Sequence, residues 1–112
     1  MQAEIEVWLE DMHRAIDEIE SFLPKEIDFA SFQKDLKTKR AVERNIEIVG
    51  EAMARILKAV PDIQISDSRK IVDTRNRIIH GYDTVSDEVL WLIVRNSLPI
   101  LSEEIKSLLK TR

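Results

Sequence analysis

The sequence predicts an all-α fold, an antiparallel four-helix up-and-down bundle with a short extra helical turn after the first helix. Apolar residues recur at intervals of three and four through most of the chain, and no segment alternates with a period of two. Only 2 Gly and 3 Pro interrupt the 112 residues, so long helices are expected. The short connections between these helices favour antiparallel neighbours.

The first half of the chain is expected to hold two long helices. The first runs from about Gln2 to Leu23, and Asp28 is predicted to cap a short helical turn after it. The second runs from about Asp35 to Ala59. Gly50 lies near its core side, and since Gly costs about 1 kcal/mol against Ala inside a helix, close helix packing is its expected purpose. The apolar stripes of these helices are Ile5, Leu9, Met12, Ile16, Ile19 and Leu23, and Val42, Ile46, Val49, Met53 and Ile56.

Two further helices are expected in the second half. The third is capped by Ser66 or Asp67 and reaches about His80, where Gly81 ends it. The fourth begins after the capping residue Ser86, with acidic residues in its first turn. Its apolar side is Leu92, Ile93, Ile100, Leu101, Ile105 and Leu108, and Pro99 within this pattern is predicted to kink it.

Composition limits the classes of function. Hydrophobic residues make up 44% and charged residues 34%, which is typical of a globular domain. The net charge of −4 argues against broad, non-specific nucleic-acid binding. Between Ser66 and Tyr82, however, four basic residues accompany two acidic ones, so this stretch carries +2 and the remainder −6. Without cysteine there are no disulfides, thiolate metal sites or cysteine nucleophiles. No signal peptide or membrane span is apparent, and a cytoplasmic location is expected.

The third helix carries an arginine where an apolar residue is expected. With 100° per residue, Ile71 and Ile79 fall about 40° on either side of Arg75, which places Arg75 at the centre of the apolar stripe. A buried arginine is costly unless it is paired or reaches solvent. Three solutions stay open: an ion pair within the chain, a side chain extended along the apolar surface, or a partner chain that creates a cleft where Arg75 meets a phosphate.

Polar residues gather at the same helix end. Asn76 and His80 lie one turn apart on the edge of the stripe. Imidazole can act as a general acid or base near neutral pH, and a guanidinium can hold a phosphate with two hydrogen bonds. Together these groups suit phosphodiester chemistry without a metal, and no cofactor or metal-binding motif is found. His13 has no special neighbours in the sequence and is interpreted as structural.

Three blocks resemble a known family. R-N-R-I-I-H-G-Y, Arg75 to Tyr82, matches the R-x-x-x-x-H-x-Y motif of the HEPN superfamily, with Asn76 in the polar position that often follows the arginine. K-T-K-R-A-V-E-R-N-I-E-I-V-G-E-A, residues 37–52, resembles the second helix of HepT-like proteins. W-L-I-V-R-N-S-L-P-I-L, residues 91–101, resembles the same family, including its proline. The resemblance covers nearly the whole chain, as a single HEPN/HepT-like domain over residues 1–112.

The resemblance implies a function as well as a fold. HepT-like proteins are homodimeric, metal-independent ribonucleases, the toxins of type VII toxin–antitoxin pairs whose antitoxin is a minimal nucleotidyltransferase. Carried over to this chain, Arg75 and His80 are the catalytic pair, Asn76 supports them and contacts RNA phosphate, and Tyr82 is modified with AMP by the antitoxin. Two alternatives stay open: a non-catalytic HEPN domain that binds nucleotide or RNA, and a helical dimerisation module in which Arg75 forms a buried ion pair.

Overall fold

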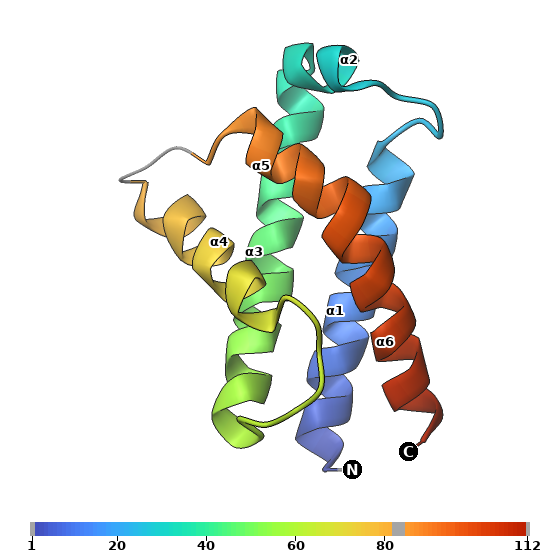
Figure 1. Ribbon diagram of the computed structural model, residues 1–112, viewed down its shortest axis with the longest axis vertical. Helices are drawn as coiled ribbons and strands as arrows, with labels where there is room; N and C mark the ends of the chain where they lie inside the picture. Colours follow the sequence, from blue (N-terminus) through green and yellow to red (C-terminus); the bar gives the residue numbers. More distant parts are fainter. Residues whose placement is uncertain (1, 82–84, 112) are drawn as a thin grey trace.

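A computed structural model describes residues 2–81 and 85–111, and every regular element in these ranges is helical. The long helices alternate in direction: α1 and α4 run one way, and α3 and the α5–α6 segment run the other (Figure 1). The predicted all-α, HEPN-like bundle is confirmed. The elements are α1 (Ala3–Phe22), α2 (Phe29–Lys34), α3 (Leu36–Ala59), α4 (Ser68–His80), α5 (Asp87–Leu92), the π-helical turn η1 (Ile93–Ser97) and α6 (Leu98–Lys110).

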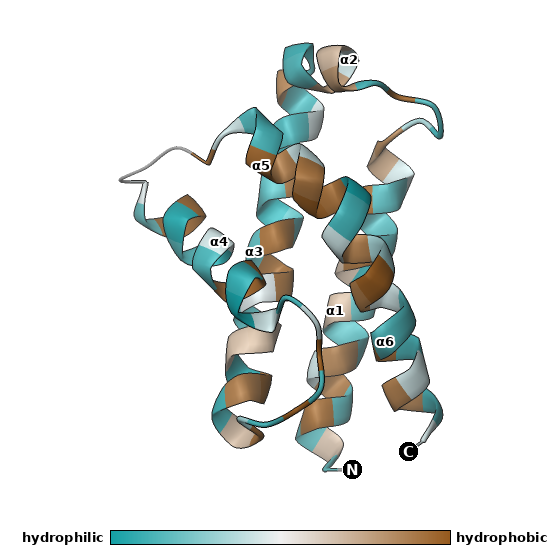
Figure 2. Cartoon of the chain, in the orientation of Figure 1, coloured by the Kyte–Doolittle hydropathy of each residue, from teal (hydrophilic) through white to brown (hydrophobic). Residues whose placement is uncertain are grey.

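The hydrophobic core lies mainly between α1, α3 and the α5–α6 segment. These helices supply nearly all of the buried apolar side chains, among them Leu9, Ile46 and Ile105. The core-facing stripes expected for α1 and α3 are buried, except that Leu23 is half-buried. α4 contributes little to the core and is largely hydrophilic (Figure 2). None of the helices in the described ranges is long and apolar enough to cross a membrane.

Gly50 allows α4 to approach α3 closely. A Cβ atom at this position would lie 2.3 Å from the Cβ and 2.8 Å from the Cγ of Arg75. Such distances are shorter than real carbon–carbon contacts, so an alanine could not replace Gly50 without a shift of α4. The prediction that Gly50 serves close helix packing is confirmed, and the residue packed against it is Arg75.

The predicted caps of Asp28 and Ser86 are confirmed, and Asp35 caps α3 in the same way. The side chains of Asp28, Asp35 and Ser86 accept hydrogen bonds from backbone N–H groups three residues later, at 2.8, 3.0 and 3.2 Å. The start of α4 differs, because Asp67 occupies the cap position with a left-handed backbone (φ 57°) and makes no side-chain cap. Its carboxylate instead accepts a hydrogen bond from the Ser97 hydroxyl at 3.1 Å, so this interaction ties the α3–α4 connection to η1.

The chain stays helical from Asp87 to Lys110 and bends on the way, between α5 and α6 (Figure 1). η1 lies at this bend, where the N–H of Leu98 bonds to the carbonyl of Ile93 five residues earlier. Pro99 follows in the first turn of α6. Because proline has no N–H and its ring crowds the carbonyl four residues before it, the wider π turn accommodates it. The predicted kink is confirmed.

Candidate functional site

The fully buried residues of α4 lie to one side of Arg75. Ile71 and Thr74 are fully buried and are centred about 70° from Arg75, while Val72 and Ile78 are half-buried, one on each side of it. Arg75 is thus at the edge of the fully buried strip and not at its centre, which corrects the prediction. α4 packs mainly on one helix, α3, and the Thr74 hydroxyl donates to the carbonyl of Lys70 at 2.9 Å. That hydrogen bond lets a polar residue occupy the buried strip.

Arg75 is held by two side chains and remains partly open to solvent. Its side chain is 24% exposed. Nη1 donates to Oδ1 of Asn76 at 2.8 Å, and Nη2 donates to a carboxylate oxygen of Glu51 on α3. The other oxygen of Glu51 lies 3.1 Å from Nη2 of Arg55. Two guanidinium groups therefore share one carboxylate, and this triad of Arg75, Glu51 and Arg55 keeps one positive charge in excess.

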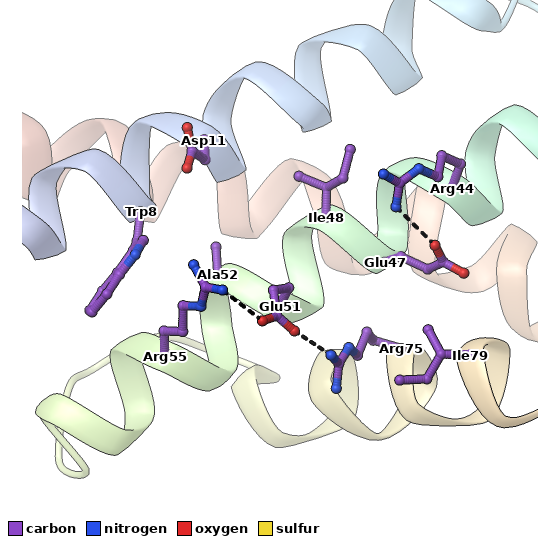
Figure 3. A pocket seen from close by; sticks show the side chains of 10 residues that line it. All are labelled: Trp8, Asp11, Arg44, Glu47, Ile48, Glu51, Ala52, Arg55, Arg75 and Ile79. Carbon is purple, nitrogen blue, oxygen red and sulfur yellow. Dashed lines mark hydrogen bonds and ion pairs between the residues drawn. The ribbon is translucent and has the colours of Figure 1, made fainter.

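An open pocket of about 410 Å³ extends from Arg75 across α3 to α1. The α3 side chains lie between the two outer helices, with Trp8 on α1 at one end and Arg75 and Ile79 on α4 at the other (Figure 3). Its volume lies within the range of small-molecule sites. The lining residues are Trp8, Asp11, Arg44, Glu47, Ile48, Glu51, Ala52, Arg55, Arg75 and Ile79.

His80 lies apart from this pocket. It is the last residue of α4, is exposed, and is not among the described residues that line the pocket. Five residues of helix separate it from Arg75 by about 7.5 Å along the axis and about 140° around it. The two expected catalytic side chains of one chain therefore lie on different sides of α4. Tyr82, the expected site of AMP modification, lies outside the described residues.

The structure also places Asn76, the residue expected to support Arg75, and His13, the histidine interpreted as structural. Asn76 is half-buried beside Arg75, and its side-chain oxygen accepts the hydrogen bond from the Arg75 guanidinium. His13 is half-buried on α1, with its Nδ1 3.4 Å from a carboxylate oxygen of Asp17. Within residues 2–81 and 85–111, no three His, Asp or Glu side chains gather as a group that could hold a metal ion.

Of the residues that line the pocket, the sequence analysis singled out Arg75 as a site residue and missed, among others, Glu51, Arg55 and Trp8. Glu51 and Arg55 lie on the polar side of α3, where charged residues usually only face solvent. Trp8 lies outside the apolar stripe of α1. One signal in the sequence could have indicated Glu51. It follows Gly50, the glycine expected at a close helix contact, and a residue next to such a contact is near the opposing helix.

Comparison with known proteins identifies the family of the chain. Residues 12–108 match the ribonuclease HepT-like family. The protein named probable ribonuclease HepT of Thermococcus cleftensis is 37% identical over 107 residues, which cover 92% of this chain and 94% of that protein. The chain belongs to the ribonuclease HepT-like family.

Further relatives of this HepT-like chain have names of the same kind. A protein of Methanocaldococcus jannaschii named putative RNase is 30% identical over 106 residues, 91% of this chain and 81% of that protein. Another of that name, from Caldanaerobacter subterraneus subsp. tengcongensis, is 30% identical over 87 residues, 77% of this chain and 78% of that protein. No solved structure is significantly similar to the chain.

Proposed function

We propose that this HepT-like chain is a metal-independent endoribonuclease and the toxin of a toxin–antitoxin pair. The observation that carries the proposal is the placement of Arg75, which Asn76 and Glu51 hold at the wall of an open pocket in a chain of a ribonuclease family. The proposed catalytic residues are Arg75 and His80, with Asn76 as the support of Arg75. Fixed donors aimed at a phosphate are the usual means of stabilising the charge that develops on it during cleavage.

The proposed reaction uses the RNA's own nucleophile. His80 takes the proton of a 2′-OH, and the oxygen attacks the adjacent phosphorus while the bond to the 5′-oxygen of the next nucleotide breaks. The products are a 2′,3′-cyclic phosphate and a 5′-hydroxyl that receives a proton. The guanidinium of Arg75 forms two hydrogen bonds to the phosphate oxygens and stabilises the added negative charge. No metal takes part in any of these steps.

Two copies of the chain would complete the site. One chain supplies one exposed histidine on α4, whereas the reaction needs both a base for the 2′-OH and an acid for the leaving oxygen. In one chain, moreover, Arg75 and His80 lie about 140° apart around the helix. A homodimer that brings two α4 helices together would supply two histidines and would let Arg75 and His80 of different chains face one phosphate.

The histidines allow a matched test of this mechanism. The purified protein is incubated with RNA in EDTA, as wild type, His80→Ala and His13→Gln. We expect His80→Ala to lower the cleavage rate by about 10²-fold or more, since general acid–base catalysis contributes about 10² to 10⁴. His13→Gln should cleave at nearly the wild-type rate. Equal cleavage by wild type and His80→Ala would refute the mechanism, and loss of cleavage in EDTA alone would refute metal independence.

The antitoxin is proposed to be a minimal nucleotidyltransferase that attaches AMP to Tyr82. The modification would add bulk and negative charge two residues from His80 and so repel RNA phosphate. Tyr82 is the only tyrosine in the chain, which makes the assignment direct. After co-expression with a nucleotidyltransferase from the neighbouring reading frame, intact mass should show added AMP units on the wild type and none on Tyr82→Phe. An unmodified wild type would contradict this part of the proposal.

The ion pair of Arg75 also supports a second candidate, a helical dimerisation module without catalysis. In that case the Arg75–Glu51 pair serves stability alone. Because Arg75 is partly exposed, removing this pair should cost only about 1 kcal/mol of stability. Arg75→Gln in the ribonuclease should therefore unfold at nearly the wild-type urea concentration while its cleavage rate falls by at least about 10²-fold. If Arg75→Gln is much less stable than the wild type, and the wild type itself cleaves no RNA, the dimerisation module is favoured.

A further inference from the structure

The pocket reaches well beyond the proposed catalytic arginine. It starts at Arg75 on α4, crosses the outer surface of α3 and ends at Trp8 on α1 (Figure 3). Catalysis as proposed needs only the end that holds Arg75. The Trp8 end is therefore a second region of the same open cavity, continuous with the position proposed for the scissile phosphate.

The positive charge of the pocket is concentrated near Arg75. Arg44 pairs with Glu47 at 3.0 Å, and Asp11 on the other wall pairs with Arg14 at 3.4 Å, so both of these acids are neutralised. Arg55 and Arg75, by contrast, share Glu51 alone. The excess positive charge is thus shared by these two guanidinium groups. Because Arg55 also lines the pocket, the positive charge extends from the Arg75 end toward Trp8. A chain of phosphates would find a second cation there.

Trp8 differs from the other tryptophan in the chain. The ring of Trp91 is in contact with Phe29 and Phe32, at centroid distances of 5.8 and 5.3 Å, and the Arg95 guanidinium lies 4.5 Å above it. Those contacts tie Trp91 to the packing of α2 against α5. Trp8 is half-buried and lines the open pocket, and none of the described rings or guanidinium groups stacks on it.

We propose that the Trp8 end of the pocket binds a nucleotide of single-stranded RNA next to the cleaved bond. The base stacks on the Trp8 indole, and the phosphate that connects this nucleotide to the scissile one contacts Arg55. Stacking on aromatic rings beside a cationic groove is the general way in which proteins hold single-stranded nucleic acid. The inference rests on the proposed ribonuclease function, which it extends by a substrate-binding site outside the catalytic pair.

Fluorescence offers a direct test, because the chain has only two tryptophans. In a Trp91→Phe variant, Trp8 is the only indole. A short single-stranded RNA with 2′-O-methyl groups, which cannot be cleaved, should quench its fluorescence in a saturable manner. If the natural ligand is an RNA chain, AMP should quench Trp8 fluorescence only at much higher concentration than the oligonucleotide. Binding of AMP as tight as that of the oligonucleotide would overturn the RNA assignment. No quenching by either probe would overturn the site itself.

Two variants of Trp8 separate stacking from packing. Trp8→Leu keeps an apolar side chain but loses the flat ring, and it should bind the same oligonucleotide about tenfold more weakly. Trp8→Phe keeps a ring and should recover most of the affinity. The urea unfolding midpoint of both variants reports any loss of packing. Equal binding by folded Trp8→Leu and wild type would contradict the proposal.

Arg55 has a matched control on its own helix. Arg55→Gln should weaken oligonucleotide binding several-fold and reduce the slope of log affinity against log salt by about one. Arg40 likewise makes an ion pair on α3, with Glu43, but does not line the pocket. Arg40→Gln, with the same change in net charge, should leave that slope unchanged. The same slope for Arg55→Gln and wild type would rule out the phosphate contact.

The outcomes also separate this inference from the proposed function. If His80→Ala abolishes cleavage while Trp8→Leu changes neither binding nor cleavage, the ribonuclease stands and the Trp8 subsite is wrong. If Trp8 responds to the oligonucleotide but the wild type cleaves no RNA, the subsite stands and the catalytic proposal is wrong. If Trp8 fluorescence changes only on dilution of the protein and not with RNA, this part of the pocket is an interface between copies of the chain, and the subsite is wrong.

Discussion

At the scale of single residues, the contact between Gly50 and Arg75 decides how α4 meets α3. The absence of a side chain at Gly50 admits the Cβ and Cγ atoms of Arg75 into the helix contact. The guanidinium group extends past this contact to Glu51 and remains partly exposed. The aliphatic part of Arg75 therefore packs while its charge stays paired and solvated, which avoids the cost of a fully buried cation.

Gly50→Ala is expected to destabilise the protein although it improves helix propensity. Replacing glycine by alanine within a helix increases stability by up to about 1 kcal/mol, whereas forcing a methyl group into a filled contact typically lowers it by about 1–3 kcal/mol. We expect a net loss of up to about 2 kcal/mol in urea unfolding. The cleavage rate should fall as well, because α4 and Arg75 move relative to Glu51.

Gly81 provides the control for this prediction. A Cβ there would meet nothing within 4 Å, but the residue ends α4 with a left-handed backbone at φ 67°. Gly81→Ala should cost about 1 kcal/mol through its backbone conformation alone. Arg75→Gly removes both the Cβ and the Cγ that a methyl group at position 50 would meet, so Gly50→Ala should cost less stability in an Arg75→Gly background than in the wild type, whereas Gly81→Ala should cost the same in both. An equal cost of Gly50→Ala in both backgrounds would contradict the steric explanation.

At the scale of elements, the helix starts make stability depend on pH. Hydrogen bonds from the hydroxyl and the backbone N–H of Thr38 lower the pKa of Asp35, the cap of α3. A hydrogen bond from the backbone N–H of Ser31 lowers the pKa of Asp28, the cap of α2. Because a lowered pKa favours the charged form in the folded state, this stabilisation is complete above the unfolded-state pKa. It is lost as the pH falls through the lower, folded-state pKa.

Asp35→Asn should remove part of this pH dependence. Asparagine also caps helices well but does not titrate, so at neutral pH we expect a small loss of stability. Between about pH 5 and pH 2 the wild type should lose more stability than the variant, and the two should converge. Urea unfolding at a series of pH values measures the difference. Parallel curves over the whole range would contradict the role of Asp35.

At the scale of the whole molecule, exposed isoleucines test the proposed homodimer. Ile79 lies on α4 beside the pocket and its exposed fraction is 45%, while Ile100 on α6 has 54%. Burial of Ile79 between two α4 helices would remove apolar surface from water. Light scattering after gel filtration should then give twice the chain mass of 13.0 kDa.

Ile79→Lys should weaken that dimer about tenfold or more, because a charged side chain would have to be buried between the two α4 helices. The cleavage rate should fall in parallel at low protein concentration. Ile100→Lys is the matched control, since the same substitution on a different helix should leave the mass and the activity unchanged. A monomeric wild type, or a dimer that Ile100→Lys disrupts and Ile79→Lys does not, would contradict an interface on α4.

The local elements could be predicted from the sequence because their causes are local. The spacing of apolar residues determines α1 and α3, the hydrogen-bonding side chains of Asp28 and Ser86 begin α2 and α5, and Gly81 ends α4. The bend before α6 follows in the same way from Pro99. The sequence alone also indicated that Arg75 has to be paired or reach solvent, since a buried cation among isoleucines is unfavourable by itself.

Only the tertiary structure decided what that partner is and which way α4 faces. Glu51 is 24 residues away from Arg75 along the chain, and the two meet because Gly50 lets their helices approach. α4 packs mainly on one helix, so its two fully buried residues lie about 70° to one side of Arg75, and Arg75 is at the edge of this strip. The same packing formed the pocket that joins Arg75 to Trp8. Periodicity records which residues share a face of one helix, but contacts between helices depend on how the faces meet.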